Sequence, residues 1–152
     1  MAGSAEEIDV AVAYAAWVAG DLVIDVRTAE EYAAGHISGA LNVPLARLPY
    51  AARDLPPGQI LTACSMGGRS WQAARRLAAL GRPALSITGG TKAWQAAGHP
   101  VTAGPNPGER RRPSLLARLV TAFRTGGRSG GRAGRTPRPG TRGSAPPASS
   151  RT

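Results

Sequence analysis

Residues 60–70 read Ile-Leu-Thr-Ala-Cys-Ser-Met-Gly-Gly-Arg-Ser, and they form the most informative segment of the sequence. The first four residues are a short apolar run, which is typical of a buried strand in a parallel sheet. From Ser70 to Leu80 the apolar positions fall at helical spacing, so the loop 64–69 connects a strand to a helix. In a parallel sheet this junction lies at the carboxyl end of the strand, where ligands bind.

This loop has the composition of an anion-binding cradle centred on Cys64. The backbone N–H groups of residues 65–70 are expected to point inwards as the loop curls towards the helix. Gly67 and Gly68 permit the unusual backbone angles that such a curl requires. Because N–H groups and the helix dipole stabilise a thiolate, we expect Cys64 to be acidified. Arg69 adds a permanent positive charge at the rim.

The rest of residues 1–103 alternates between helical and strand patterns. Helices are expected at 10–19, 29–34, 47–54, 70–80 and 91–97, and strands at 22–26, 41–43, 60–63 and 84–87. Two signals compete to cap the first helix: Asp9, and a capping box formed by Ser4 and Glu7. Thr28 is expected to cap the second. The alternation predicts an α/β fold, a small parallel sheet with helices on both faces.

Charge divides the chain into two parts. Residues 1–103 contain eight basic and eight acidic side chains, whereas residues 104–152 contain eleven arginines and one acid, Glu109, and so hold the whole net charge of +10. Arg, Gly and Pro make up 27 of these last 49 residues, which leaves too little apolar surface to offset the entropy cost of ordering them. We therefore expect a folded domain at 5–103 and a mostly disordered tail at 104–152, with an amphipathic helix at 114–124.

The tail admits three interpretations. It is an inert extension, or it binds nucleic acid or another polyanion, or its helix docks on the domain, a partner or an anionic membrane surface. Eleven arginines supply the attraction for a polyanion. Because the tail is nearly free of stacking aromatic residues, such binding would be non-specific and salt-sensitive. We favour disorder with a short conditional helix.

Several classes of protein are excluded by composition. A single cysteine excludes an intramolecular disulfide framework, a cysteine-rich zinc site and a CxxC redox pair. The two histidines, His36 and His99, lie 63 positions apart, which excludes an HExxH-type site. We therefore expect neither a metal nor a cofactor. No apolar run approaches the ~18 residues of a membrane span, and acidic residues precede the first apolar run where a secretory signal would be basic. We expect a cytoplasmic protein.

The loop at residues 64–70 resembles the active-site loop of rhodanese-homology domains, the sulfurtransferases that carry sulfur as a cysteine persulfide. Two further segments resemble signatures of the same family. The first comprises DVR at 25–27, EY at 31–32, GHISGA at 35–40 and NVP at 42–44, and the second comprises GGTKAW at 89–94 and GHPV at 98–101. The resemblance covers roughly residues 5–103 and implies one complete domain of this family.

The resemblance implies sulfur transfer through a persulfide on Cys64. It places the persulfide and the substrate in the loop formed by Ser65, Met66, Gly67, Gly68 and Arg69. Four residues separate Cys64 from Arg69, which is the short form of the loop; related phosphatases have a longer one, so a phosphate-ester or arsenate enzyme is disfavoured. Members that prefer thiosulfate often have a basic residue directly after the cysteine, where this chain has serine, so the resemblance does not name the donor.

The sulfur acceptor must be external, a small thiol or a protein thiol, because the chain has no second cysteine. The rival interpretation is a non-catalytic binding or regulatory module of the same fold. Asp25 either orients the loop from behind or caps the turn at Thr28. We expect Arg27 and Glu31 to form a structural ion pair.

Three further residues are given structural roles by the same reasoning. His36 is expected to be a hydrogen-bonded turn residue, and Trp94 a core residue. Trp71 either packs in the core or borders the pocket entrance, and packing is favoured.

Overall fold

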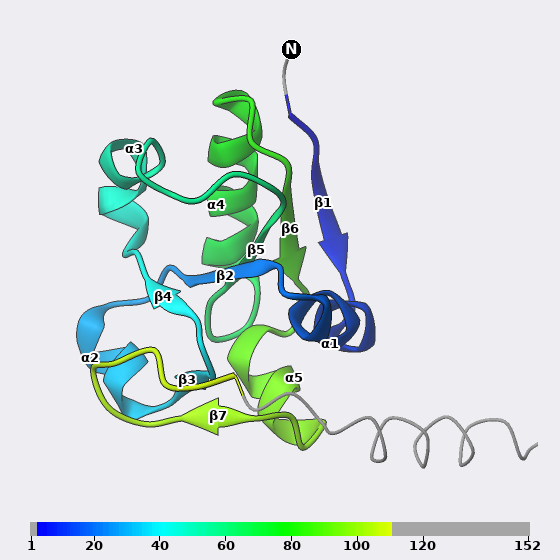
Figure 1. Cartoon of the computed structure of the whole chain (residues 1–152), viewed down its shortest axis with the longest axis vertical. Coiled ribbons are helices and arrows are strands. Elements are labelled where there is room, and N and C mark those ends of the chain that lie inside the picture. The colour runs from blue at the N-terminus through cyan, green and yellow to red at the C-terminus, as the bar shows by residue number, and fades with distance from the viewer. Residues whose placement is uncertain (1–2, 111–152) are drawn as a thin grey trace, which may run out of the picture. The chain divides into compact units, whose positions relative to one another are not determined.

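The computed structural model describes residues 3–110, whose centre is a five-stranded parallel sheet (Figure 1). The strands of this sheet are β1 (Ala5–Ile8), β2 (Leu22–Asp25), β4 (Leu41–Asn42), β5 (Ile60–Ala63) and β6 (Ala84–Ile87). Their spatial order is β1-β6-β5-β2-β4, so β5, which precedes the cysteine loop, is the central strand. A separate antiparallel pair joins β3 (His36–Ile37) to β7 (Val101–Thr102).

Helices cover both faces of the sheet, which confirms the expected α/β architecture. They are α1 (Val10–Ala19), α2 (Ala29–Ala34), the 3-10 helix η1 (Leu45–Arg47), α3 (Leu48–Ala51), α4 (Gly68–Ala79) and α5 (Gly90–Ala96). Adjacent residues of β2 point to opposite faces: Ile24 packs with α3 and α4, whereas Val23 packs with α1 and α5. Strand β2 therefore contributes to two separate apolar cores.

Local signals set the helix starts where the sequence predicts them. Asp9 is the cap of α1, because its Oδ1 accepts a hydrogen bond from the backbone N–H of Val12 at 2.8 Å. Gly20 ends that helix with φ 107°. At α2, Thr28 and Glu31 form a reciprocal capping box in which each side chain binds the other residue's backbone N–H.

Two segments differ from the sequence expectation. Ser4 and Glu7 do not cap a helix, because residues 5–8 are β1 and pair in register with β6. The backbone hydrogen bonds offered by that strand outweigh a local capping signal. The single helix expected at 47–54 is instead η1 followed by the one-turn α3. Pro49 accounts for the break, since it has no N–H to donate to the carbonyl of Leu45 four residues earlier.

Residues 104–110 contact the folded domain beside α2 and β3. The N–H of Gly104 donates to the carbonyl of Ala33 at 2.8 Å, and the N–H of Gly39 donates to the carbonyl of Pro107 at 2.7 Å. The helix expected at 114–124, and the rest of the tail to residue 152, lie outside the described residues. A domain boundary at residue 103 stays a prediction.

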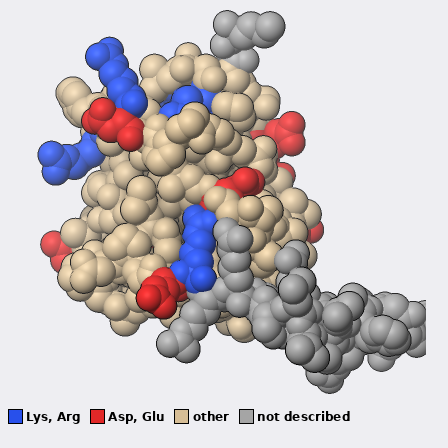
Figure 2. Space-filling model, in the orientation of Figure 1, with Lys and Arg blue, Asp and Glu red and all other residues tan. Residues whose placement is uncertain are grey.

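The visible surface of the domain carries acidic and basic side chains side by side rather than gathered by sign (Figure 2). This mixture agrees with the equal numbers of acidic and basic residues in 1–103. Between residues 3 and 110, no helix has the length and apolar character that a membrane crossing needs.

Candidate active site

Cys64 directly follows the central strand β5, at the carboxyl edge of the sheet. Asp25, the last residue of the neighbouring strand β2, is paired in register with Ala63, so both strands end beside the cysteine. The cysteine is a free thiol and only 2 % exposed. After three loop residues the chain enters α4 at Gly68. The strand–loop–helix arrangement expected from the sequence is therefore present.

The sulfur atom of Cys64 is surrounded by polar groups of its own loop. The backbone N–H of Gly67 donates to Sγ at 3.0 Å, and the Ser70 hydroxyl lies 3.5 Å from Sγ. That hydroxyl is itself held by two contacts, one to the carbonyl of Gly67 at 2.9 Å and one to Oγ of Ser86 at 2.9 Å. Ser70 is thus fixed between the loop and β6, facing the sulfur.

These groups make the thiol more acidic than an ordinary cysteine. Burial by itself raises the pKa of Cys64. The hydrogen-bonding contact with the Ser70 hydroxyl and the hydrogen bonds from the backbone N–H groups of Ser70, Gly67 and Met66 outweigh that effect, and the pKa of Cys64 falls below its usual value. The side chain therefore favours the nucleophilic thiolate more than a free cysteine does.

Only one of the two loop glycines needs its conformational freedom. Gly67 has φ 121°, a backbone conformation that disfavours any other residue. Gly68 does not have such an angle and begins α4, and a Cβ there would meet nothing within 4 Å. The expectation of strained angles at Gly68 is wrong, because the loop completes its curl at Gly67.

The start of α5 holds the other side of the loop. The backbone N–H of Thr91 donates to the carbonyl of Cys64 at 2.7 Å, and that of Lys92 donates to the carbonyl of Ser65 at 3.3 Å. A Cβ at Gly90 would overlap the carbonyl oxygen of Cys64 and lie 2.8 Å from the carbonyl carbon of Ser65. Only glycine permits this approach. With these carbonyls bound by α5, later N–H groups of the loop face Sγ.

Arg69 at the rim forms an ion pair with Glu31 of α2. Its two terminal nitrogens donate to the two carboxylate oxygens at 2.8 and 2.9 Å, and one also reaches Oγ of Ser65 at 3.3 Å. The hydrogen bond from Arg69, with one from the backbone N–H of Thr28, lowers the pKa of Glu31 to about 2. The pair is partly exposed, at 38 % for Arg69 and 37 % for Glu31.

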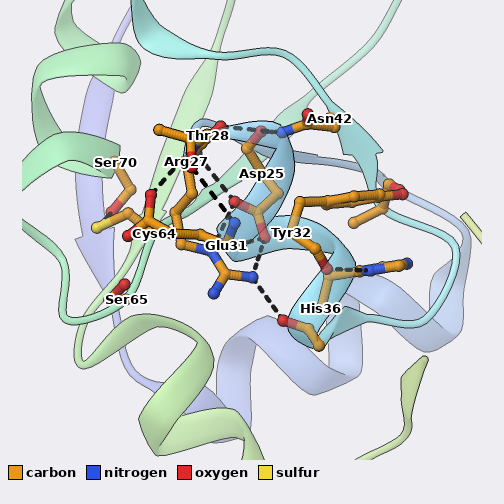
Figure 3. Close-up of polar contacts among 12 residues, drawn as sticks. Asp25, Arg27, Thr28, Glu31, Tyr32, His36, Asn42, Cys64, Ser65 and Ser70 are labelled. Atoms are coloured by element: carbon orange, nitrogen blue, oxygen red, sulfur yellow. Dashed lines mark hydrogen bonds and ion pairs between the residues drawn. The ribbon is translucent and has the colours of Figure 1, made fainter. Parts of the chain in front are cut away.

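Arg27 pairs with Asp25, so the expected ion pair between Arg27 and Glu31 is wrong. The Asp25 carboxylate accepts hydrogen bonds from the backbone N–H, Nε and Nη2 of Arg27, the last at 2.7 Å (Figure 3). Arg27 also donates to the carbonyl of Gly35 at 2.6 Å. Within residues 3–110, the Asp25 carboxylate has no hydrogen bond to Thr28 or to residues 64–70. Its direct role here is to fix Arg27.

The remaining expected residues are easily placed. Met66 is 69 % exposed at the loop tip, and Trp71 packs against the core formed with α3 and α4. Trp94 is fully buried, as expected. His36 lies in β3 rather than a turn and is also fully buried; its ring stacks on Tyr32 at 3.6 Å between centroids. Both ring nitrogens contact backbone carbonyls.

Sequence reasoning missed the roles of three residues that shape the site: Ser86, Gly90 and Glu31, the acidic partner of Arg69. Two of them leave a signal in the sequence. Ser86 is the one hydroxyl in the otherwise apolar strand 84–87, and Gly90 belongs to a Gly-Gly pair. Glu31 belongs to the EY pair at 31–32, but nothing in the sequence indicates its contact with Arg69, which lies 38 positions away.

Comparison with known proteins places this fold in a family. The family model described as "Rhodanese-like domain" matches residues 10–97. Thiosulfate sulfurtransferase 16 of Arabidopsis thaliana is 34 % identical over 110 residues, which are 63 % of this chain and 92 % of that protein. A sulfurtransferase of Allochromatium vinosum is 34 % identical over 84 residues, 54 % of this chain and 78 % of its own length.

A solved structure gives the same result. The rhodanese-related protein of Thermoplasma volcanium superposes with a TM-score of 0.60 at 28 % identity, covering 64 % of this chain and 97 % of that one. The names of the relatives favour an enzyme of the sulfurtransferase type. The chain belongs to the family of rhodanese-like domains.

Proposed function

We propose that this protein is a sulfurtransferase that carries sulfane sulfur as a persulfide on Cys64. The observation that supports this most directly is the N–H of Gly67 pointing at Sγ from 3.0 Å, in a loop that lowers the pKa of the cysteine. The same N–H groups that favour a thiolate would favour the anionic outer sulfur of a persulfide. The relatives named as sulfurtransferases support the reaction class.

The reaction has two displacements. In the first, the Cys64 thiolate attacks the outer sulfur of a donor such as thiosulfate; a sulfur–sulfur bond forms at Cys64, and the donor's own bond to that sulfur breaks. The leaving group, sulfite in the case of thiosulfate, takes the electron pair. In the second, the thiolate of an external acceptor attacks the outer sulfur, and Cys64 leaves as a thiolate. Arg69 would assist the binding of an anionic donor.

Intact mass spectrometry tests this proposal. After incubation with thiosulfate or 3-mercaptopyruvate, the mass should rise by that of one sulfur atom, and cyanide should remove it. The variant Cys64→Ser is the control and should gain no mass, because a hydroxyl cannot hold a persulfide. If no sulfane donor adds sulfur to the native chain, the non-catalytic binding module is the better explanation.

Two further proposals concern the setting of this activity. We propose that the tail binds polyanions non-specifically, because residues 104–152 hold the whole net charge of +10. A chain ending at Arg110 should then elute from heparin at much lower salt than the full chain, and equal elution would contradict the idea. A cytoplasmic setting stays a prediction from sequence, to be checked by fractionation of cells that express the protein.

A further inference from the structure

A cavity of about 210 Å³ opens beside the cysteine loop, between α2 and α5. Ser65, the residue next to Cys64, forms part of its wall. At ~30 Å³ each, about seven water molecules would fill it, and it is smaller than the ~300–1,000 Å³ sites that enclose drug-sized ligands. Its size suits a small polar group attached to a short carbon chain.

The charged side chains around this cavity are unequally engaged. Arg27 is neutralised by Asp25, and Glu31 by Arg69. Lys92 also lines the cavity, is exposed, and forms no ion pair with any of residues 3–110. The cavity therefore carries one uncompensated positive charge, on the flexible side chain of Lys92.

A residue on the same wall has a buried hydroxyl without a partner. Thr91 lines the cavity and is only 3 % exposed, and within residues 3–110 its Oγ1 is the one buried side-chain polar atom without a hydrogen bond. Burying an unsatisfied hydroxyl is costly, so such groups call for an explanation. Gln95, one helical turn after Lys92, adds an amide to this wall.

We propose that this cavity binds the carboxylate of a small thiol that accepts sulfur from Cys64. Lys92 supplies the charge, and rotation of the Thr91 side chain about χ1 brings its hydroxyl to the cavity, where it donates a hydrogen bond to a carboxylate oxygen. This assignment rests on the proposed function and names its acceptor class. In the transfer step the acceptor thiolate attacks the outer sulfur of the Cys64 persulfide. A new sulfur–sulfur bond forms, the bond to Cys64 breaks, and Cys64 takes the electron pair.

An acceptor fits the cavity better than a donor such as thiosulfate. Thiosulfate presents its charge within one bond of the transferred sulfur, where the loop N–H groups already provide donors. The cavity lies one residue further along the loop, at Ser65. A ligand reaching from Cys64 to Lys92 needs a thiol separated from its anionic group by a short chain, which a carboxylated thiol provides.

Transfer kinetics to a matched pair of thiols test the assignment. With thiosulfate as donor, 3-mercaptopropionate is compared with its neutral amide, 3-mercaptopropionamide. Lys92→Gln should lower the ratio of kcat/KM for the acid to that for the amide by about five- to tenfold, because the lost contact involves a charged side chain that solvent screens in part. Lys92→Arg should restore most of the ratio. Arg75→Gln, which removes an exposed charge from α4 away from the cavity, is the matched control and should leave the ratio unchanged.

Thr91→Val separates binding from folding. Because the native hydroxyl has no partner within the described residues, its replacement by a methyl group should not lower the free energy of unfolding. The same variant should reduce the acid-to-amide ratio by about threefold, as expected for the loss of one hydrogen bond. A drop in stability with an unchanged ratio would show that Thr91 is structural, and would contradict its part in the proposal.

A readout without turnover uses the fact that Lys92 is the only lysine in the sequence. Reductive methylation with ¹³C keeps the positive charge and gives one lysine signal in the NMR spectrum. 3-Mercaptopropionate should shift that signal in a saturable way, and the amide should not. Equal effects of both compounds would overturn the proposal.

Two other outcomes are equally informative. If Lys92→Gln slows persulfide formation from 3-mercaptopyruvate but leaves the acceptor ratio intact, the cavity serves a carboxylated donor and the acceptor assignment is wrong. If no donor loads Cys64 at all, the proposed function fails. The NMR titration then still decides whether a carboxylate binds at Lys92.

Discussion

Two arginine–carboxylate pairs lie beside Cys64, and they differ mainly in their contact with solvent. Arg27 and Asp25 are 8 % and 0 % exposed at the side chain, whereas Arg69 and Glu31 are 38 % and 37 % exposed. Their shortest nitrogen–oxygen distances are nearly equal, at 2.7 and 2.8 Å. Geometry alone would therefore make them equivalent, and burial is what separates them.

The difference in exposure indicates which of the two arginines a substrate could reach. A buried pair that loses one partner leaves an uncompensated charge in a low-dielectric interior, so Arg27 is committed to the fold. A solvent-exposed pair contributes little stability, because water and salt replace it at small cost. In the proposed reaction, Arg69 could therefore exchange part of its contact with Glu31 for an anionic donor, whereas Arg27 could not exchange Asp25.

The largest expected effect is on stability. Arg27→Gln should lower the free energy of unfolding by about 3–5 kcal/mol, because it leaves the fully buried Asp25 carboxylate without its partner. Arg69→Gln should lower it by at most about 1 kcal/mol. Urea unfolding followed by circular dichroism measures both values. Equal losses in the two variants would show that burial does not distinguish the pairs.

Much of this architecture follows from sequence patterns that act over a few residues. Strand β5, the cap of α2 at Thr28, and the end of α1 at Gly20 each depend on neighbours in the chain, and all were predictable. The short strands β3 and β7 were not. Each has two residues, and they form only because segments 64 to 66 positions apart meet, in the pairings of Ile37 with Val101 and of His36 with Thr102.

The same distinction between local patterns and contacts of distant segments applies to the candidate site. The position of Cys64 and the curl of its loop are local, and the sequence predicted both. The partners of the two arginines are not local: Asp25 and Glu31 are each close to Arg27 in sequence, and spacing alone could not choose between them. Arg69, which lies on α4, binds Glu31, and Asp25 is then the carboxylate that pairs with Arg27. The close approach of Gly90 to Cys64 is likewise a contact between distant segments.

The second prediction concerns substrate recognition by the exposed pair. Arg69→Ala should weaken the use of anionic donors more than that of neutral ones, by about 1–3 kcal/mol in transition-state binding, since it removes a charged hydrogen-bond donor at the rim. The backbone N–H groups around Cys64 stay in place. The rate of persulfide formation with thiosulfate and with a neutral organic donor gives the comparison. Equal losses for both donors would mean that Arg69 holds the loop rather than the substrate.

The smallest expected effect is a pH dependence of stability that belongs to the exposed pair. The pKa of Glu31 is lowered from 4.5 to about 2 in the folded protein, chiefly by the hydrogen bond from Arg69. A lowered pKa means that the folded state holds the charged form more tightly than the unfolded state does. The pair therefore stabilises the fold above pH 4.5, and this contribution is lost as the pH falls from 4.5 to about 2.

Glu31→Gln isolates this contribution, because glutamine can still cap α2 while it lacks the charge that binds Arg69. At pH 7 the variant should be less stable than the native chain by at most about 1 kcal/mol, since the pair is well exposed. Near pH 2.5 the two should converge, as measured by urea unfolding at each pH. Glu30→Gln is the matched control: it removes a charge from the same helical turn but no ion pair, and should show a smaller difference at pH 7. If the Glu31→Gln difference stays constant from pH 7 to 2.5, the loss comes from the cap rather than from the ion pair, and the contrast between the two arginines rests on stability alone.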